Sequence, residues 1–332
     1  MPNLTRRSLM TGAAATGVLA VAATQVRADT VEVPSDLGGK SVLITGCSSG
    51  FGRLMAESFA RKGAKVFATM RNLPRPEAAE LEALAKAEDL DLSVLELDVL
   101  DDQQVLRAVA KAEEMAGGAL DVVVNNAGIS TAGPIEIQDM EATQLLFDTN
   151  VYGPHRLARA ALPAMRAARS GQIFNVTSQL GRVIVPGYGQ YSPTKFALEA
   201  MSEQMAYELA PHGIEVTIIQ PGGYPTKIWE NSTELSLALL DRAHPHHTDG
   251  YSAMIEQIRS RSGGGGSTDP MDVPNAIARI IAMPAGTRPL RMPVHPGLKP
   301  QVAINEVSAK TQVQWLGESP LGPLVKAVHK LG

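Results

Sequence analysis

Short apolar runs rich in Val, Ile and Leu alternate along the chain with longer segments in which apolar and polar residues mix. The runs show little polar alternation, which is typical of strands buried on both faces of a parallel sheet. They lie at Ser41–Thr45, Lys65–Thr69, Asp91–Leu97, Asp121–Asn125, Gln172–Thr177 and Glu215–Gln220, with a possible edge strand at Pro289–Val294. The intervening segments predict helices at Arg53–Lys62, Pro76–Ala87, Asp101–Met115, Gln138–Ala168, Pro193–Leu209 and Asp272–Met283.

The order of strand, helix and strand at this spacing predicts right-handed βαβ units and a doubly wound α/β sheet in one domain. Asp101 is a plausible cap for the third helix. The stretch Tyr224–Arg261 interrupts the alternation, and the four glycines at Gly263–Gly266 then predict a hinge or linker. Residues 297–332 contain Pro and Gly breaks and receive no assignment.

Composition and charge exclude several classes of protein. Hydrophobic residues make up 44% of the 332 residues and charged residues 19%, which is ordinary for a globular protein. The net charge of −4 provides no basic field for nucleic acid. The single cysteine, Cys47, excludes an internal disulfide and a thiolate-clustered metal site. His244, His246 and His247 lie close together, but we expect solvated histidines and predict no metal.

The first segment has the layout of a bacterial signal peptide. Arg6 and Arg7 precede a mildly apolar stretch, Ala13–Ala23, and Val26–Ala28 offers a cleavage point. Paired arginines favour the twin-arginine export route. Residues 1–28 are therefore predicted to be a signal, with the twin-arginine machinery as a partner and the periplasm as the location. A disordered basic tail or an uncleaved anchor is the alternative, and the protein is cytoplasmic if the segment is no signal.

A glycine-rich turn follows the first predicted strand, with the sequence TGCSSGFG at residues 45–52. Missing side chains allow backbone to approach a pyrophosphate, and the helix N-terminus supplies N–H donors. The GxxxGxG spacing differs from the common GxGxxG, so a purely structural turn is the alternative. The candidate nucleotide-binding residues here are Gly46, Ser48, Ser49, Gly50, Phe51 and Gly52. Cys47 is interpreted as a small residue in a tight loop rather than a redox-sensitive thiol.

The end of the second strand bears on the choice of cofactor. An NAD site typically has an acidic side chain there for the ribose hydroxyl, whereas this chain has Ala68-Thr69-Met70-Arg71-Asn72. The Arg71 guanidinium suits a 2′-phosphate. We therefore predict NADP rather than NAD. The alternative is that Arg71 is only a solvated surface charge.

Tyr191, Lys195 and Ser178 form a candidate proton-transfer set. Tyr191 and Lys195 are four residues apart, so one helix face presents both. A tyrosine with an ordinary pKa near 10 is a poor base, and lowering that pKa by about 3 units needs roughly 4 kcal/mol. Lys195 and a positively charged nicotinamide ring could supply this stabilisation. Ser178, after the fifth strand, would hold the substrate oxygen.

The combination of motifs resembles the short-chain dehydrogenase/reductase superfamily over about residues 38–295. The matching positions are TGCSSGFG at 45–52, Asp98-Val99, Asn125-Asn126-Ala127-Gly128, Asn150, Ser178, Tyr191 with Lys195, and Pro221-Gly222 followed by Thr226. The resemblance implies a Rossmann-type sheet of about seven strands. It also implies an enzyme acting on CH–OH groups, and homo-oligomers formed through the long helices at 138–168 and 193–209.

The resemblance also implies roles for individual residues. Tyr191 would be the general acid or base, Ser178 would orient the substrate oxygen, and Lys195 would bind the nicotinamide ribose. Asn150 would hold a water in a proton relay. The remaining cofactor contacts would be Asp98 and Val99 at the adenine, Asn126, Ala127 and Gly128 along the cofactor, and Pro221, Gly222 and Thr226 beside the nicotinamide.

The substrate is expected beneath a lid, residues 224–266, because the insert lies where this fold usually places one. Its apolar residues either line a pocket or pack the lid onto the body; they are Ile228, Trp229, Leu235, Leu237, Leu239, Leu240, Met254, Ile255 and Ile258. Tyr188 is a further candidate for substrate contact. We predict an NADP-dependent oxidoreductase for a moderately apolar secondary alcohol or ketone. The alternatives are a non-catalytic cofactor-binding sensor or scaffold, and an isomerase or epimerase that retains its cofactor.

Overall fold

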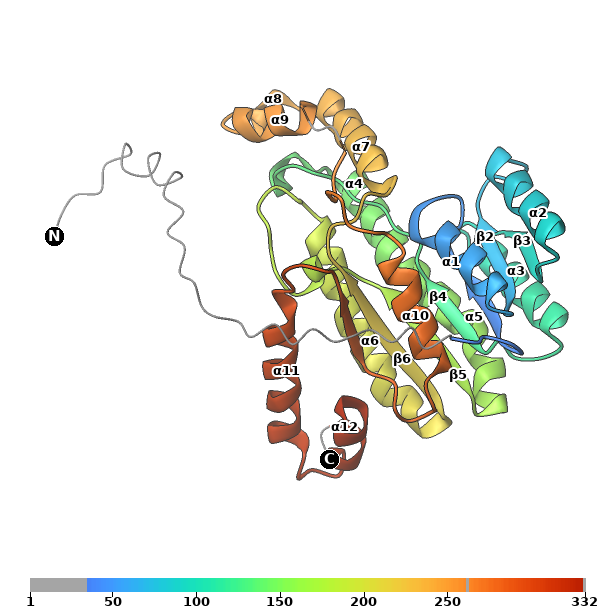
Figure 1. Cartoon of the computed structure of the whole chain (residues 1–332). Coiled ribbons are helices and arrows are strands. Elements are labelled where there is room, and N and C mark those ends of the chain that lie inside the picture. Colours follow the sequence, from blue (N-terminus) through green and yellow to red (C-terminus); the bar gives the residue numbers. More distant parts are fainter. Residues whose placement is uncertain (1–34, 261–262, 331–332) are drawn as a thin grey trace. The chain divides into compact units, whose positions relative to one another are not determined.

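The computed structural model describes residues 35–260 and 263–330, so the predicted signal peptide at residues 1–28 lies outside the described residues. Seven parallel strands form one sheet in the order β3-β2-β1-β4-β5-β6-β7 (Figure 1). The strands are β1 (Ser41–Ile44), β2 (Lys65–Met70), β3 (Leu92–Glu96), β4 (Val122–Asn125), β5 (Gly171–Val176), β6 (Ile214–Pro221) and β7 (Arg291–Val294).

The predicted doubly wound α/β fold is confirmed, and each predicted strand is present with ends shifted by one or two residues. β1, β4 and β5 are buried at every position, as their unbroken apolar runs indicate. The strand order reverses between β1 and β4. In a sheet of this type, ligands bind outside the carboxyl ends of the strands at such a switch point.

Helices cover both faces of the sheet. Successive strand residues point to opposite faces, so Val42 belongs to the apolar cluster under α1, α2 and α10, whereas Leu43 belongs to the cluster under α3, α5 and α6. The first group is α1 (Gly50–Arg61), α2 (Pro76–Glu88) and α10 (Asp272–Ala282). The second group is α3 (Asp102–Ala116), α5 (Gly153–Ala168) and α6 (Tyr191–Leu209).

The predicted helix at 138–168 contains a local irregularity. It consists of α4 (Met140–Phe147), a π-helical turn η2 (Asp148–Tyr152) and α5. A π turn shifts the register of the backbone hydrogen bonds and is often found at functional sites. Here it contains Asn150.

Asp101 caps α3 as predicted, because its Oδ1 accepts hydrogen bonds from Gln103 N at 2.8 Å and Gln104 N at 3.0 Å.

The predicted lid is helical and lies at the top of Figure 1. It comprises α7 (Ile228–Arg242), α8 (Pro245–Thr248) and α9 (Ser252–Arg259). The C-terminal segment forms α11 (Gln301–Leu316) and α12 (Gly322–His329) beyond β7. Short 3₁₀ helices are also present at η1 (Ile135–Ile137), η3 (Gln179–Gly181) and η4 (Ala210–His212). Within residues 35–260 and 263–330, no helix has the length and apolarity needed to cross a membrane.

Candidate active site

A cleft of about 700 Å³ opens at the carboxyl ends of the central strands. All but two of the predicted site residues line it. They are Gly46, Ser48, Ser49, Gly50, Phe51, Arg71, Asp98, Val99, Asn126, Ala127, Gly128, Ser178, Tyr188, Tyr191, Lys195, Pro221, Gly222 and Thr226. Gly52 and Asn150 are buried beside the cleft without lining it.

The glycine turn is shaped by close backbone contacts. Gly46 has a φ of +74°, and a Cβ there would lie 3.0 Å from Ala127 Cα. A Cβ at Gly52 would lie 2.2 Å from the Gly46 carbonyl oxygen. Gly52 therefore allows α1 to pack on the turn, which explains why it does not face the cleft. Ser49 precedes α1 and makes no side-chain cap, and the start of the helix lines the cleft through Gly50 and Phe51.

Thr45 ties this turn to the loop after β4. Its Oγ1 accepts hydrogen bonds from the backbone N–H groups of Asn126 and Ala127, both at 3.0 Å. The Asn126 side chain donates to the Thr45 carbonyl at 2.8 Å.

Cys47 is fully buried, and burial raises the pKa of its thiol to about 12. Such a thiol is protonated and unreactive at neutral pH, which agrees with the prediction of a small packing residue.

The loop between β2 and α2 carries two arginines that line the cleft, and the sequence analysis identified only Arg71. Arg75 also lines the cleft. Its guanidinium binds the Glu77 carboxylate through Nε at 2.9 Å and Nη2 at 3.0 Å. The hydrogen bond from Arg75 is the largest cause that lowers the pKa of Glu77 to about 2. Arg75 lies four residues beyond Arg71, outside the segment in which the cofactor-selecting residue was sought.

The predicted proton-transfer residues come together in the cleft. Ser178 follows β5, and Tyr191 is the first residue of α6, which places Pro193 in the first turn where proline is tolerated. Tyr191 and Ser178 form a side-chain hydrogen bond. Lys195 Nζ lies 5.6 Å from the centroid of the Tyr191 ring and donates to the Val176 carbonyl at 3.0 Å.

Burial changes the pKa values of both Tyr191 and Lys195. Burial raises the pKa of its hydroxyl to about 12, and the hydrogen bond from Ser178 only partly opposes this. Burial also lowers the pKa of Lys195 to about 8, with the charge of Glu199 acting in the opposite direction. In the protein alone, the cost of burying the phenolate therefore exceeds the stabilisation that the neighbouring groups provide. The predicted lowering of the Tyr191 pKa includes the charge of the nicotinamide ring and stays a prediction.

Asn150 joins the loop after β4 to α6. Its Oδ1 accepts from Ile129 N at 2.9 Å, and its Nδ2 donates to the Ile129 carbonyl at 2.9 Å and to Thr194 Oγ1 at 3.0 Å. A Cβ at Gly128 would lie 3.2 Å from Asn150 Oδ1 and 3.6 Å from Lys195 Nζ. The π turn thus brings Asn150 into contact with Thr194, the residue before Lys195, while its side chain also holds the backbone at Ile129.

The lid uses its apolar residues in both of the predicted ways. Ile228, Trp229 and Leu235 line the cleft, together with the polar residues Asn231, Ser232 and Glu234, which the sequence analysis did not identify. A second set packs the lid onto the body through a cluster that includes Ala132, Ile137 and Ala142; its lid members are Leu237, Leu239, Leu240, Ile255 and Ile258.

The remaining lid features concern the glycine segment and the histidines. Gly265, from the predicted hinge, also lines the cleft. His247 Nδ1 lies 3.4 Å from Glu136 Oε1. The rings of His244 and His246 lie 4.7 Å apart in a tilted arrangement. The described part of the chain holds no group of three or more His, Cys, Asp or Glu residues arranged to bind a metal ion.

Comparisons with known proteins agree with this arrangement. The sequence profile of the short chain dehydrogenase family matches residues 40–236. Human retinol dehydrogenase 8 is 33% identical over 254 residues, which are 75% of this chain and 79% of the human protein. A gluconate 5-dehydrogenase from Burkholderia cenocepacia, solved in complex with NADP and tartrate, is 28% identical with a TM-score of 0.56, covering 63% of this chain and 80% of that chain.

A second solved structure has the same fold at lower sequence identity. It is a short chain dehydrogenase/reductase from Burkholderia phymatum in complex with NAD. Its TM-score is 0.66 at 24% identity, and the match covers 86% of this chain and 97% of that chain. Proteins with this fold thus bind either NAD or NADP.

Proposed function

Because the chain belongs to the short chain dehydrogenase family, an enzyme family that acts on CH–OH groups, we propose that it transfers hydride between NADP and a moderately apolar secondary alcohol or ketone. The observation that carries the proposal is the convergence of Ser178, Tyr191 and Lys195 in the cleft that the glycine turn also lines. A non-catalytic binding protein has no need of this set.

The residues present fit a dinucleotide. The Gly46 turn lies against Ala127 with no room for a side chain, and α1 begins at the cleft without a side-chain cap. This is the combination that accepts a pyrophosphate. Asp98 and Val99 would contact the adenine, and Pro221, Gly222 and Thr226 would flank the nicotinamide. The bound nicotinamide would accept or supply the hydride.

The protein's own groups would handle the proton. Tyr191 would donate a proton to the substrate oxygen or accept one from it, and Ser178 would hold that oxygen by a hydrogen bond. Lys195 would bind the nicotinamide ribose and stabilise the phenolate. Because the protein alone leaves the pKa of Tyr191 high, the positive charge of an oxidised nicotinamide is part of the stabilisation that the proposal requires. Asn150 is proposed to support the proton relay behind Lys195.

Tyr191→Phe tests the chemistry directly. We expect this variant to lose turnover while its nucleotide affinity stays nearly unchanged, because the substitution removes one hydroxyl and keeps the ring. A panel of alcohols and ketones with both nicotinamide nucleotides would supply the activity, and nucleotide fluorescence would supply the affinity. Tyr251→Phe is the matched control, because it also removes one tyrosine hydroxyl, which bonds to Glu136 outside the cleft. Turnover retained by Tyr191→Phe would refute the mechanism.

The preference for NADP is proposed because the guanidinium of Arg71, with Arg75 beside it, suits a 2′-phosphate. Arg71→Ala is expected to weaken NADPH binding by about 10- to 100-fold and to leave NADH binding unchanged, since a hydrogen bond to a charged group contributes roughly 1.5–3 kcal/mol. Arg107→Ala, at an exposed position of α3, is the control. Tighter binding of NADH than of NADPH by the unaltered protein would overturn the preference.

The substrate proposal rests on the lining of the lid side of the cleft. Ile228, Trp229, Leu235, Leu180 and Val185 supply apolar surface there. Glu234, Asn231 and Tyr188 add polar groups. This mixture favours a substrate that is largely apolar with polar substituents. The panel of alcohols and ketones should therefore include pairs of substrates that differ only in the length of an apolar chain.

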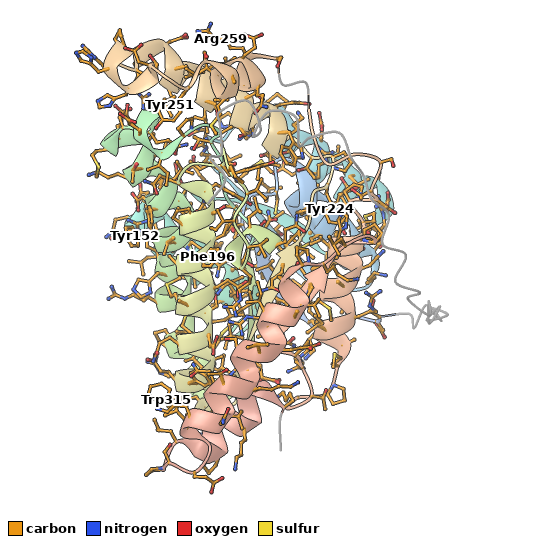
Figure 2. All side chains as sticks on the ribbon, turned by 90° about the vertical axis from the view of Figure 1, so that its left-hand side faces the viewer. Tyr152, Phe196, Tyr224, Tyr251, Arg259 and Trp315 are labelled. Carbon is orange, nitrogen blue, oxygen red and sulfur yellow. The ribbon has the colours of Figure 1, made fainter. Side chains whose placement is uncertain are left out.

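Export and assembly are further proposals. Arg6 and Arg7 before the apolar stretch support a twin-arginine signal and a periplasmic location, which Arg6→Lys with Arg7→Lys would test by fractionation of cells. Self-association through the long helices is supported by exposed aromatic side chains, Tyr152 at 52% and Phe196 at 38% (Figure 2). Mass measurement in solution would test it. A periplasmic enzyme of this type would need to keep and recycle its nucleotide in place.

A further inference from the structure

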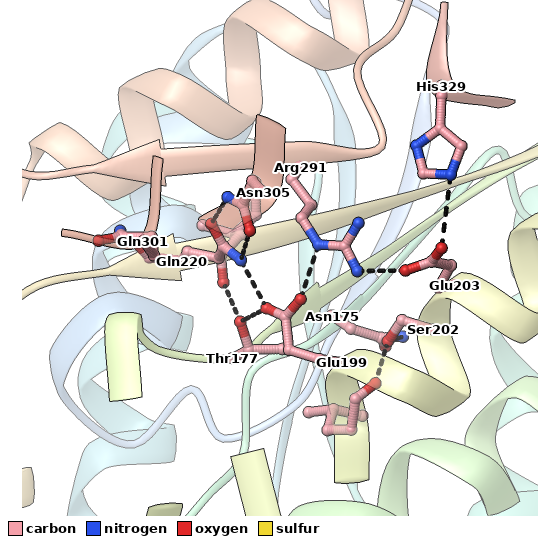
Figure 3. Close-up of polar contacts among 12 residues, drawn as sticks. Asn175, Thr177, Glu199, Ser202, Glu203, Gln220, Arg291, Gln301, Asn305 and His329 are labelled. Carbon is pink, nitrogen blue, oxygen red and sulfur yellow. Dashed lines mark hydrogen bonds and ion pairs between the residues drawn. The ribbon is translucent and has the colours of Figure 1, made fainter. Parts of the chain in front are cut away.

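A buried polar network contacts α6 one turn beyond Lys195 (Figure 3). Its centre is Glu199, which is 1% exposed. Arg291 Nε, from β7, donates to Glu199 Oε2 at 2.8 Å. Gln220 Nε2, from β6, donates to Glu199 Oε1 at 2.8 Å, and Thr177 Oγ1 lies 2.8 Å from the same oxygen. Three elements thus converge on one carboxylate, which is the pattern that stabilises a buried charge.

Arg291 connects this carboxylate to a second one. Its Nη2 lies 2.5 Å from Glu203 Oε2, and its side chain is 6% exposed. Burial raises the pKa of Glu203, but hydrogen bonds from His329 and the charge of Arg291 outweigh this and lower it below its usual range. Arg182 faces the same cluster, where burial and the charge of Arg291 lower its pKa.

The C-terminal helices complete the network. Asn305, on α11, donates to Gln220 Oε1 at 2.7 Å, and Gln301 Nε2 donates to the Gln220 carbonyl at 3.4 Å. On α12, His329 Nε2 lies 3.4 Å from Glu203 Oε1 and 2.7 Å from the Tyr207 hydroxyl. These helices follow the region that matches the family profile, residues 40–236, so this part of the network is a feature of the chain beyond that region.

The network bears on Lys195 through charge. Glu199 lies one turn from Lys195 on the same helix, so both groups share one face. Burial lowers the pKa of the lysine to about 8, and the negative charge of Glu199 opposes that change. Arg291 offsets part of the Glu199 charge. The other titratable groups that face this region are Tyr191 and Tyr188 on the cleft side, and Arg182, Glu203, Tyr207 and His329 on the network side.

We propose that Glu199 is a positioning residue that, together with Arg291, sets the protonation of Lys195, and that α11 and α12 hold this pair in place. The consequence for catalysis rests on the proposed function. The protonation of Lys195 can be measured without turnover. The role of Glu199 and the proposed function can therefore be refuted independently of each other. Removal of the charge at position 199 and removal of the charge at position 291 must shift the pKa of Lys195 in opposite directions, because the two charges are opposite in sign.

The test is the pH dependence of the reaction of Lys195 with acetic anhydride in the folded full-length protein. Only the neutral amine reacts, so the labelled fraction of the Lys195 peptide, measured by mass spectrometry, gives its pKa. Glu199→Gln is expected to lower the pKa of Lys195 by about one unit, a tenfold change in the ratio of amine to ammonium. Arg291→Gln is expected to raise it, and Arg291→Lys to restore it toward the original value.

Glu208→Gln is the matched control, because Glu208 is an exposed glutamate of the same helix. It is expected to leave the titration of Lys195 unchanged. If Glu199→Gln and Glu208→Gln behave alike, the proposal is overturned, whether or not Arg291→Gln folds. Shifts in the same direction for Glu199→Gln and Arg291→Gln would also overturn it, since they would indicate general damage to the structure.

The pH profile of kcat separates this proposal from the proposed function. If both hold, the profile of Glu199→Gln moves in the same direction as the titration of Lys195. If the labelling shifts appear but no alcohol or ketone is turned over, Glu199 still sets the protonation of Lys195 and the proposed function fails. If turnover is found but its pH profile and the labelling are unmoved by Glu199→Gln, the proposed function stands and the role of Glu199 is wrong.

Discussion

The glycine turn and the lid line the same cleft, yet they are built in different ways. The turn is shaped by contacts between backbone atoms, such as those that fill the space a side chain would need at Gly46 and Gly52. The lid is held by apolar side chains, including Leu239 and Ile258, in a separate small cluster. The first arrangement allows few alternative residues, whereas many apolar residues could serve the second. This difference determines which substitutions each region tolerates.

Gly52→Ala should disturb the glycine turn more than the lid substitutions described below disturb the lid. The new Cβ would lie 2.2 Å from the Gly46 carbonyl oxygen and 2.6 Å from Asn126 Nδ2. Because backbone at this position cannot move without opening the turn, we expect nucleotide binding to be lost and the free energy of unfolding to fall by about 3 kcal/mol. Denaturant unfolding and nucleotide fluorescence measure the two effects.

Gly118→Ala is the control for this substitution, because a Cβ there would meet nothing within 4 Å. It should leave both measurements unchanged. Normal nucleotide affinity in Gly52→Ala would show that the turn can adapt, and the contrast between a backbone-built and a side-chain-built region would disappear.

The lid should respond to substitution in a graded way. Leu239 is 1% exposed and packs in the cluster that joins the lid to the body, whereas Leu235 lines the cleft. Leu239→Ala is expected to destabilise the lid by about 2 kcal/mol through loss of buried contacts and to raise KM for the alcohol or ketone. Leu235→Ala should raise KM with little effect on stability. Hydrogen exchange across residues 228–259 and steady-state kinetics distinguish the two variants.

Neither lid variant should alter nucleotide affinity, so this measurement distinguishes the lid from the glycine turn. A loss of nucleotide binding in Leu239→Ala would mean that the two regions fold as one unit. An unchanged exchange rate in that variant would mean that the apolar cluster does not hold the lid.

Whether a feature rests on backbone periodicity and residue spacing or on individual side-chain contacts also explains how much the sequence alone could predict. The sheet, its helices and the set of Ser178, Tyr191 and Lys195 were all predictable, because backbone periodicity and residue spacing determine them. The C-terminal helix α11 was not, since only Gln301 among its residues is buried and no apolar stripe marks a buried face. Trp315, near its end, is 76% exposed (Figure 2). Polar contacts through Gln301 and Asn305 hold α11, and no sequence pattern reports such contacts.

Two features of the site were also beyond the sequence. The π turn around Asn150 adds one residue to a helical turn, which is too local to disturb an apolar pattern. The pKa of Tyr191 depends on how deeply the hydroxyl is buried, and residue spacing carries no information on depth. Spacing therefore predicted which groups meet in the cleft but not their protonation.

The smallest of the expected effects concerns Cys47, at the centre of the glycine turn. Burial raises the pKa of its thiol from 9.0 to about 12. The folded state therefore holds this proton more tightly than the unfolded state does. The resulting contribution to stability is complete below pH 9 and is lost as the pH rises toward 12. Between pH 8 and pH 10, the unaltered protein should lose about 1 kcal/mol more of its free energy of unfolding than Cys47→Ala does.

Denaturant unfolding of both proteins at the two pH values measures this difference, and all other titrating groups cancel in the comparison. A thiol reagent gives an independent check, because the buried, protonated thiol should react only as fast as the protein unfolds. Equal losses for the two proteins, with rapid modification in the folded state, would mean that water reaches the interior of the turn. The turn would then be as adaptable as the lid, and its close backbone contacts would not be what makes it intolerant of substitution.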